Sequence, residues 1–114
     1  MKKLNEILGT KYPIIQGGMA NIATGEFAAA CSNAGALGMI ATGGWDGDRL
    51  RQEIRRAKEL TDKPFGVNLM LMNPEVEEQA RLLVDMQVLI GVVVVHVEGD
   101  LEFHAADGVH QLAD

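Results

Sequence analysis

Cysteine, aromatic side chains and long apolar runs are all scarce in this sequence of 114 residues. The single cysteine, Cys31, cannot form a disulfide within the chain, which fits a reducing compartment. The longest apolar run, over residues 88–95, falls far short of the ~20 residues that cross a bilayer. The N-terminus does not show a basic start followed by a leucine-rich stretch and a small-residue cleavage site, the pattern that directs secretion. We therefore expect a cytoplasmic protein with no membrane partner.

Basic residues are also few, at ten against sixteen acidic ones, and the net charge is −6. An acidic chain repels nucleic acid unless its basic residues gather into a patch. The only basic cluster, within residues 48–59, is interleaved with aspartate and glutamate, which is typical of a solvated helix face. His104 and His110 lack the spacing of metal ligands. We therefore expect neither a nucleic-acid partner nor a bound metal.

Apolar residues make up 47% of the chain and charged residues 23%, which is enough apolar side chain for a folded core. Hydrophobic periodicity, capping residues and glycine or proline stops divide the sequence into alternating helices and strands. Helices are expected over residues 3–8 and 24–34, from a cap at Asp46 or Asp48 to a stop at Lys63-Pro64, from Asn73-Pro74 onward, and over 105–113. Strands are expected over residues 13–16, 37–41, 65–70 and 88–97.

Two of these helices carry an apolar stripe at helical spacing. The residues expected to face the core are Leu50, Ile54, Ala57 and Leu60 in the first of them, and Val76, Ala80, Leu83 and Met86 in the second. The strand over 88–97 is a continuous β-branched run, which predicts burial on both faces.

Four strands that alternate with helices through short loops indicate right-handed βαβ units and a parallel sheet, which is an α/β fold. In such folds ligands bind at the carboxyl ends of the strands. The loops that matter therefore follow Gln16, Ala41, Met70 and Val97. The first two are rich in glycine, and Asn68 places an amide at the third strand end, but none offers an obvious acid, base or nucleophile. The loops predict a binding site and leave the catalytic residues unidentified.

Three segments, in order along the chain, resemble the FMN-dependent enoyl-acyl-carrier-protein reductases and the related nitronate monooxygenases. They are residues 12–20 (YPIIQGGMA), residues 29–38 (AACSNAGALG) and residues 60–72 (LTDKPFGVNLMLM). The third segment looks more like the reductases than the monooxygenases. The resemblance covers residues 4–86, about three quarters of the chain.

The resemblance implies the N-terminal half of a (β/α)8 barrel, with about four strands, that holds FMN at the carboxyl ends of its strands. Reduced NAD(P)H would pass hydride to the flavin, and the flavin would reduce a 2-enoyl thioester, either a small molecule or one carried on acyl carrier protein. In the monooxygenases the flavin instead oxidises a nitronate with oxygen. By position, the residues implied to bind the cofactor are Gly18, Met19, Ala20, Thr42 and Asn68.

The resemblance ends after residue 86, and residues 87–114 form a divergent tail. Where the family continues with a Thr-Thr-Gly-Ala-Gly-Asn-Pro segment, this chain has a valine-rich run over residues 91–99. We therefore expect a single truncated domain over residues 1–114, less than half of the ~250 residues of such a barrel. Two alternatives stay open: a flavoenzyme of this group, or a non-catalytic module whose open sheet edges drive self-association into a homo-oligomer.

Overall fold

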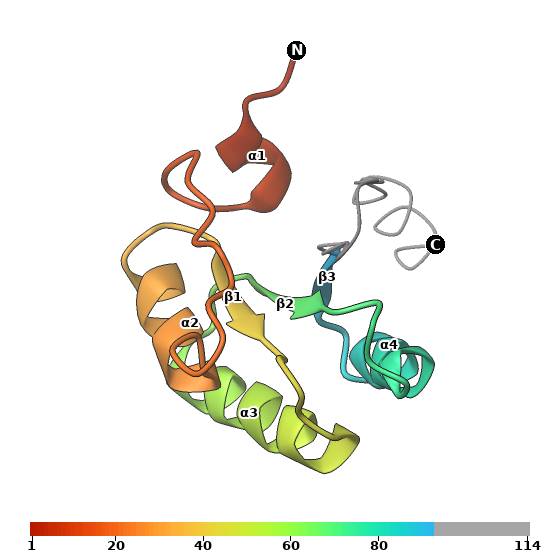
Figure 1. The fold of residues 1–114 in the computed structure, drawn as a ribbon. Coiled ribbons are helices and arrows are strands. Elements are labelled where there is room, and N and C mark those ends of the chain that lie inside the picture. The colour runs from red at the N-terminus through yellow and green to blue at the C-terminus, as the bar shows by residue number, and fades with distance from the viewer. Residues whose placement is uncertain (93–114) are drawn as a thin grey trace.

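The computed structural model describes residues 1–92 of the chain (Figure 1). The expected strand beyond residue 92, the expected helix over 105–113 and the rest of the tail lie outside the described residues. Among residues 1–92, no helix has the length and apolar character needed to cross a membrane.

From α2 onward, helices and strands alternate along the described residues, as the sequence predicts (Figure 1). In chain order they are α1 (Leu4–Leu8), α2 (Gly25–Asn33), β1 (Gly38–Ala41), α3 (Gly47–Leu60), β2 (Phe65–Leu69), α4 (Val76–Asp85) and β3 (Leu89–Val92). Side chains cap two of the helices, because Thr24 accepts a hydrogen bond from the Phe27 amide and Asp46 accepts one from the Arg49 amide. Most of the expected elements are thereby confirmed, with Asp46 rather than Asp48 as the cap of α3.

The strands form one parallel sheet in the order β1-β2-β3. Gly38 of β1 lies opposite Phe65 of β2, and Ile15 forms a single parallel bridge to Leu37, just before β1. The strand expected over residues 13–16 is therefore reduced to one bridge. Among the described residues, this segment pairs with a strand on one side only. Ile14 and Ile15 are 55% and 49% exposed, so their side chains do not pack against a core that would stabilise further pairing.

The core lies where α2 packs on β1 and α3, and where α4 packs on α3 and β2. Three of the four α3 residues expected to face the core are buried, namely Leu50, Ile54 and Ala57. The fourth expectation is wrong, because Leu60 is 37% exposed. Leu60 is the last residue of α3, and the helix ends there before the Leu60 side chain can pack on the sheet.

Helix α4 begins at Val76, later than the start expected at Asn73-Pro74. The Asn73 side chain accepts a hydrogen bond from the Glu75 amide and donates one to the Trp45 carbonyl. It therefore closes a turn and is not free to cap the helix. Of the four α4 residues expected to face the core, Leu83 is buried, and Val76, Ala80 and Met86 are partly buried and packed against the core. Gln79 and Leu82 are also buried, which the sequence did not predict.

Two glycines lie where α2 passes closest to its neighbours. A Cβ on Gly38 would overlap the carbonyl oxygen of Ala28 in α2, and a Cβ on Gly25 would overlap the carbonyl oxygen of Glu53 in α3. The Gly38 amide also donates a hydrogen bond of 3.0 Å to the buried Ser32 hydroxyl. Only residues without a side chain let α2 lie against β1 and α3 at this backbone distance.

Replacing Gly38 with alanine is expected to lower the free energy of unfolding by about 1–3 kcal/mol or more, because the new methyl group overpacks the contact with α2. Urea denaturation followed by circular dichroism measures the change. Gly47→Ala is the matched control, since nothing lies within 4 Å of a Cβ at Gly47 and alanine favours the helix that begins there. Equal losses of stability in the two variants would contradict the close approach.

Candidate functional site

The carboxyl ends of β1 and β2 meet at one edge of the sheet because the two strands are parallel. Ala41, the last residue of β1, lies opposite Asn68 of β2 at this edge. Residues 17–20, which follow the bridge at Ile15, reach the same place. In α/β folds this edge is where ligands bind, so the site is built from here.

Gln16 ties residues 17–20 to β1 through its side chain. Its backbone amide donates a hydrogen bond of 2.9 Å to the Leu37 carbonyl, as in a parallel strand. Its side chain continues the pairing, because the Met39 amide donates to Oε1 at 2.8 Å and Nε2 donates to the Met39 carbonyl at 3.2 Å. The side-chain amide thus takes the place of the next backbone pair.

Gln16 is not among the residues that the sequence predicts to bind a cofactor. The available signal is its position, since a polar amide stands directly between an apolar run and a glycine pair. Only the structure shows that the amide is used for strand pairing.

Gly18 places bare backbone over the ends of both strands. A Cβ on Gly18 would lie 3.1 Å from Nδ2 of Asn68 and 3.4 Å from Cβ of Ala41. At Gly17, by contrast, nothing lies within 4 Å of the Cβ position. Gly18 is therefore the member of the glycine pair whose missing side chain shapes the site.

Thr42 is buried directly after β1, and its hydroxyl donates a hydrogen bond of 2.9 Å to the Asn68 carbonyl. This bond joins the chain that leaves β1 to the end of β2. It fixes the backbone that carries the Asn68 amide. Thr42 and Asn68 are thus brought together, and the Thr42 side chain is turned toward the neighbouring backbone.

Met19 and Ala20 complete the rim of the site. Met19 is 41% exposed, and its carbonyl accepts a hydrogen bond of 2.8 Å from the Ala23 amide. A Cβ on Gly43 would meet the Ala20 Cβ at 3.4 Å, so the loop after β1 lies beside residues 17–20. The structure therefore gathers all the residues expected to bind a cofactor, which are Gly18, Met19, Ala20, Thr42 and Asn68. Their role in binding stays a prediction.

Backbone groups, an amide and apolar side chains dominate this edge. Nowhere in residues 1–92 do three or more His, Cys, Asp or Glu side chains come together in a way that could hold a metal. The nearest aromatic ring belongs to Trp45, which packs partly against the core and carries the Arg49 guanidinium 4.9 Å from its centroid. Such a surface suits a planar group held by hydrogen bonds and flat contacts. The five residues expected to bind the cofactor carry no carboxylate, imidazole or thiol side chain.

A hollow of about 360 Å³ adjoins this edge, between the loops that follow β1 and β2. It gives a ligand at the strand ends room to extend toward the start of α4. The residues that line it, two of them carboxylates, are Gly44, Trp45, Asp46, Met70, Met72, Asn73, Pro74 and Glu75.

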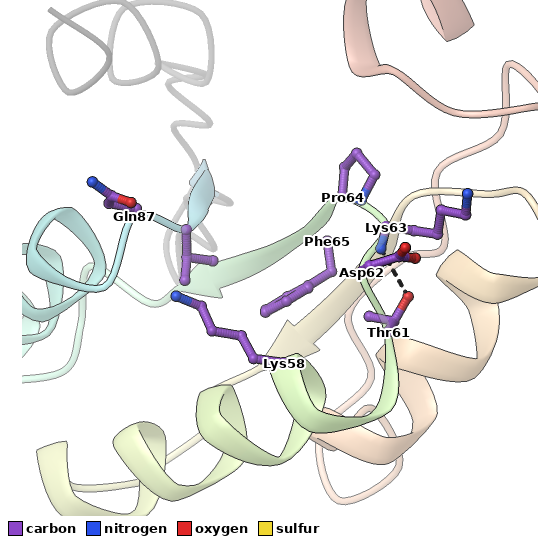
Figure 2. A pocket seen from close by; sticks show the side chains of 8 residues that line it. Lys58, Thr61, Asp62, Lys63, Pro64, Phe65 and Gln87 are labelled. Carbon is purple, nitrogen blue, oxygen red and sulfur yellow. Dashed lines mark hydrogen bonds between the residues drawn. The ribbon is translucent and has the colours of Figure 1, made fainter.

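A second hollow, of about 400 Å³, lies at the opposite edge, where β2 begins (Figure 2). Figure 2 shows Lys58 extending from α3 toward the segment of Gln87, and the Lys58 ammonium donates a hydrogen bond to the Met86 carbonyl. Lys58 therefore links the end of α3 to the end of α4. Features at the amino ends of parallel strands in barrel folds usually serve stability, and the hollow at the carboxyl ends is the candidate site.

Comparison with known proteins identifies relatives of the chain. The family model described as nitronate monooxygenase matches residues 1–99. The chain is 51% identical over 69 residues to a probable nitronate monooxygenase of Staphylococcus saprophyticus, which is 60% of this chain and 19% of that protein. It is 44% identical over 79 residues to a nitronate monooxygenase of Pseudomonas aeruginosa, which is 69% of this chain and 22% of that protein.

Among solved structures, FabK from Thermotoga maritima matches with a TM-score of 0.76 at 36% identity, over 82% of this chain and 30% of that chain. The chain thus spans about a fifth of the length of the curated relatives that it matches. Its parallel βα units are those of part of a (β/α)8 barrel, which confirms the fold class expected from the sequence.

Proposed function

The chain belongs to the nitronate monooxygenase family, and from that premise we propose that it supplies FMN-binding strand ends to an oxidoreductase. Enzymes of this family use a flavin. The finer assignment, FMN as the flavin and NAD(P)H as the reductant where one is needed, is part of the proposal. It follows from the resemblance of the three sequence segments.

One observation carries the proposal, which is the bare backbone of Gly18 against the Asn68 amide and Ala41. A Cβ at this position would crowd the Asn68 side chain and Ala41, so only a glycine lets the backbone of residues 17–20 lie this close to the strand ends. This backbone, together with Asn68 and Ala41, forms the cradle against which the edge of a flavin would lie. The backbone of residues 18–20 would lie along the ring, and the Asn68 amide would hydrogen-bond to the ring or to the ribityl chain. Thr42 would line the same edge of the sheet, while its hydroxyl donates a hydrogen bond to the Asn68 carbonyl.

When bound, the flavin supplies the redox chemistry, while the protein binds and orients it. The residues proposed to bind the flavin are suited to this role, because they offer hydrogen bonds and close-packed backbone and carry no ionisable side chain.

Gly18→Ala is expected to raise the dissociation constant for FMN by about fivefold to a hundredfold, because the added methyl enters the cradle beside Asn68. Titration of FMN with the purified chain, followed by quenching of flavin fluorescence, measures it. Gly17→Ala is the control and should bind FMN like the unchanged chain, since a Cβ there meets nothing. Equal binding by both variants would rule out a cradle at Gly18, and no binding by the unchanged chain would count against the proposal.

For the whole protein we propose oxidation of a nitronate with oxygen as the reaction. The support is the match to the family model and the 51% identity to a relative of that name. Reduction of a 2-enoyl thioester by NAD(P)H is the second candidate. It is supported by residues 60–72, whose sequence resembles the reductases, and by the likeness to FabK. The substrate is a small molecule in the first case, and in the second it can also be carried on acyl carrier protein.

Oxygen uptake separates the two reactions. We expect the FMN-loaded whole protein to consume oxygen when a nitronate such as propyl-2-nitronate is added without NAD(P)H. An oxygen electrode measures this, with FMN alone as the blank. Oxidation of NAD(P)H under anaerobic conditions that depends on an added 2-enoyl thioester, without oxygen uptake on nitronate, would contradict the first candidate and support the second.

We also propose that copies of this chain self-associate. Open sheet edges and exposed apolar side chains favour association. Several large apolar side chains near the strand ends are between 41% and 57% exposed, and they are Ile14, Ile15, Met19, Ile22, Leu71 and Met72. Light scattering is therefore expected to give a mass above the 12.3 kDa of one chain, rising with protein concentration. A constant monomer mass at high concentration would contradict this.

A further inference from the structure

Gln79 is a fully buried amide on the core-facing side of α4. Its neighbours on that side, Leu82 and Leu83, are apolar. In the part of the chain that the structure describes, Oε1 of Gln79 has no hydrogen-bond donor. A buried acceptor without a donor costs folding free energy that an apolar side chain of similar size would not cost. The stability of the core therefore does not explain why an amide stands at this position.

The hydrogen bond made by the NH2 group of the same amide explains its presence. Nε2 of Gln79 donates a hydrogen bond of 2.8 Å to the Trp45 carbonyl, and Nδ2 of Asn73 donates one of 3.3 Å to the same oxygen. A carbonyl can only accept, so Gln79 has to present its NH2 group to Trp45, and Oε1 is left without that partner. Two amides from the α4 side thus hold one carbonyl of the loop between β1 and α3.

This loop borders the proposed flavin site. The Trp45 amide donates a hydrogen bond of 2.7 Å to the Thr42 carbonyl and closes the turn. Within the turn, Thr42 holds the Asn68 carbonyl, and Gly43 lies beside Ala20. A shift of Trp45 would therefore be passed to both sides of the cradle.

We propose that Gln79 is a positioning residue, which holds the Trp45 carbonyl and thereby sets the turn over residues 42–45 against Asn68 and Ala20. The proposal rests on the proposed function, because the site that it serves is the flavin site. It assigns no contact between Gln79 and the flavin.

A positioning role and a merely structural role have opposite consequences when Gln79 becomes methionine, which is close in size and makes no such hydrogen bond. If the amide mainly stabilised the core, Gln79→Met would unfold at a lower temperature. If it mainly positions the turn, the variant removes an unsatisfied oxygen while Asn73 still donates to the Trp45 carbonyl, so stability is kept while Trp45 is held less firmly and the turn moves.

Three measurements on the full 114-residue chain test this: the unfolding temperature, acrylamide quenching of Trp45 fluorescence without flavin, and the dissociation constant for FMN. Trp45 is the only tryptophan, so its fluorescence reports on this turn alone. Gln52→Met is the matched control, because it makes the same chemical change at an exposed position of α3.

For Gln79→Met we expect an unfolding temperature that is unchanged or higher, stronger quenching of Trp45, and a dissociation constant for FMN raised by about twofold to tenfold. Gln52→Met should match the unchanged chain in all three. A lower unfolding temperature, a failure to fold, unchanged Trp45 quenching, or unchanged FMN affinity in a chain that binds FMN would each overturn the role of Gln79. If the unchanged chain binds no FMN, the proposed function fails, while the Trp45 measurement still decides whether Gln79 holds the turn.

Discussion

Backbone contact between α2 and its neighbours is the constraint on which the rest of the structure depends. Gly38 brings β1 against the α2 carbonyl of Ala28, and Gly25 brings the start of α2 against the Glu53 carbonyl of α3. The Glu53 side chain also accepts a hydrogen bond of 3.2 Å from the Gly25 amide, which satisfies one of the unpaired donors at the start of α2. With α2 held at this distance, the apolar residues of β1, β2 and α3 close into one core. The carboxyl ends of the strands are then fixed at one edge.

The candidate site at that edge is held in place by side-chain amides and a hydroxyl that bond to backbone groups. Gln16 pairs with Met39 in place of a strand residue, and Thr42 joins the end of β1 to the Asn68 backbone. Gln79 donates a hydrogen bond to the Trp45 carbonyl in the loop between β1 and α3. Each bond fixes the position of backbone, and backbone is what the site presents. Such an arrangement suits a protein that binds and orients a reactive cofactor and leaves the redox chemistry to it.

Local signals in the sequence were enough for most of the fold, because a cap such as Thr24 or Asp46 acts on amides within three residues. The loops that form the site could be predicted, since parallel strands place their carboxyl ends together. The individual cofactor-binding residues were implied by the resemblance to the flavin-dependent family. The start of α4 could not be predicted, because Asn73 bonds to a carbonyl 28 residues away. The roles of Gln16 and Gln79 could not be predicted for the same reason, because their hydrogen-bond partners lie 23 and 34 residues away in the sequence. Nothing near them in sequence shows those partners.

FMN binding at the carboxyl ends of β1 and β2 is the claim on which the function depends. Titration of the 15N-labelled chain with FMN, followed by amide NMR, tests it residue by residue. The largest shifts are predicted at Gly18, Met19, Ala20 and Asn68, with the amide of Lys58 at the opposite edge unchanged. Shifts concentrated around the lysine-lined hollow of Figure 2, or no shifts at all, would contradict it.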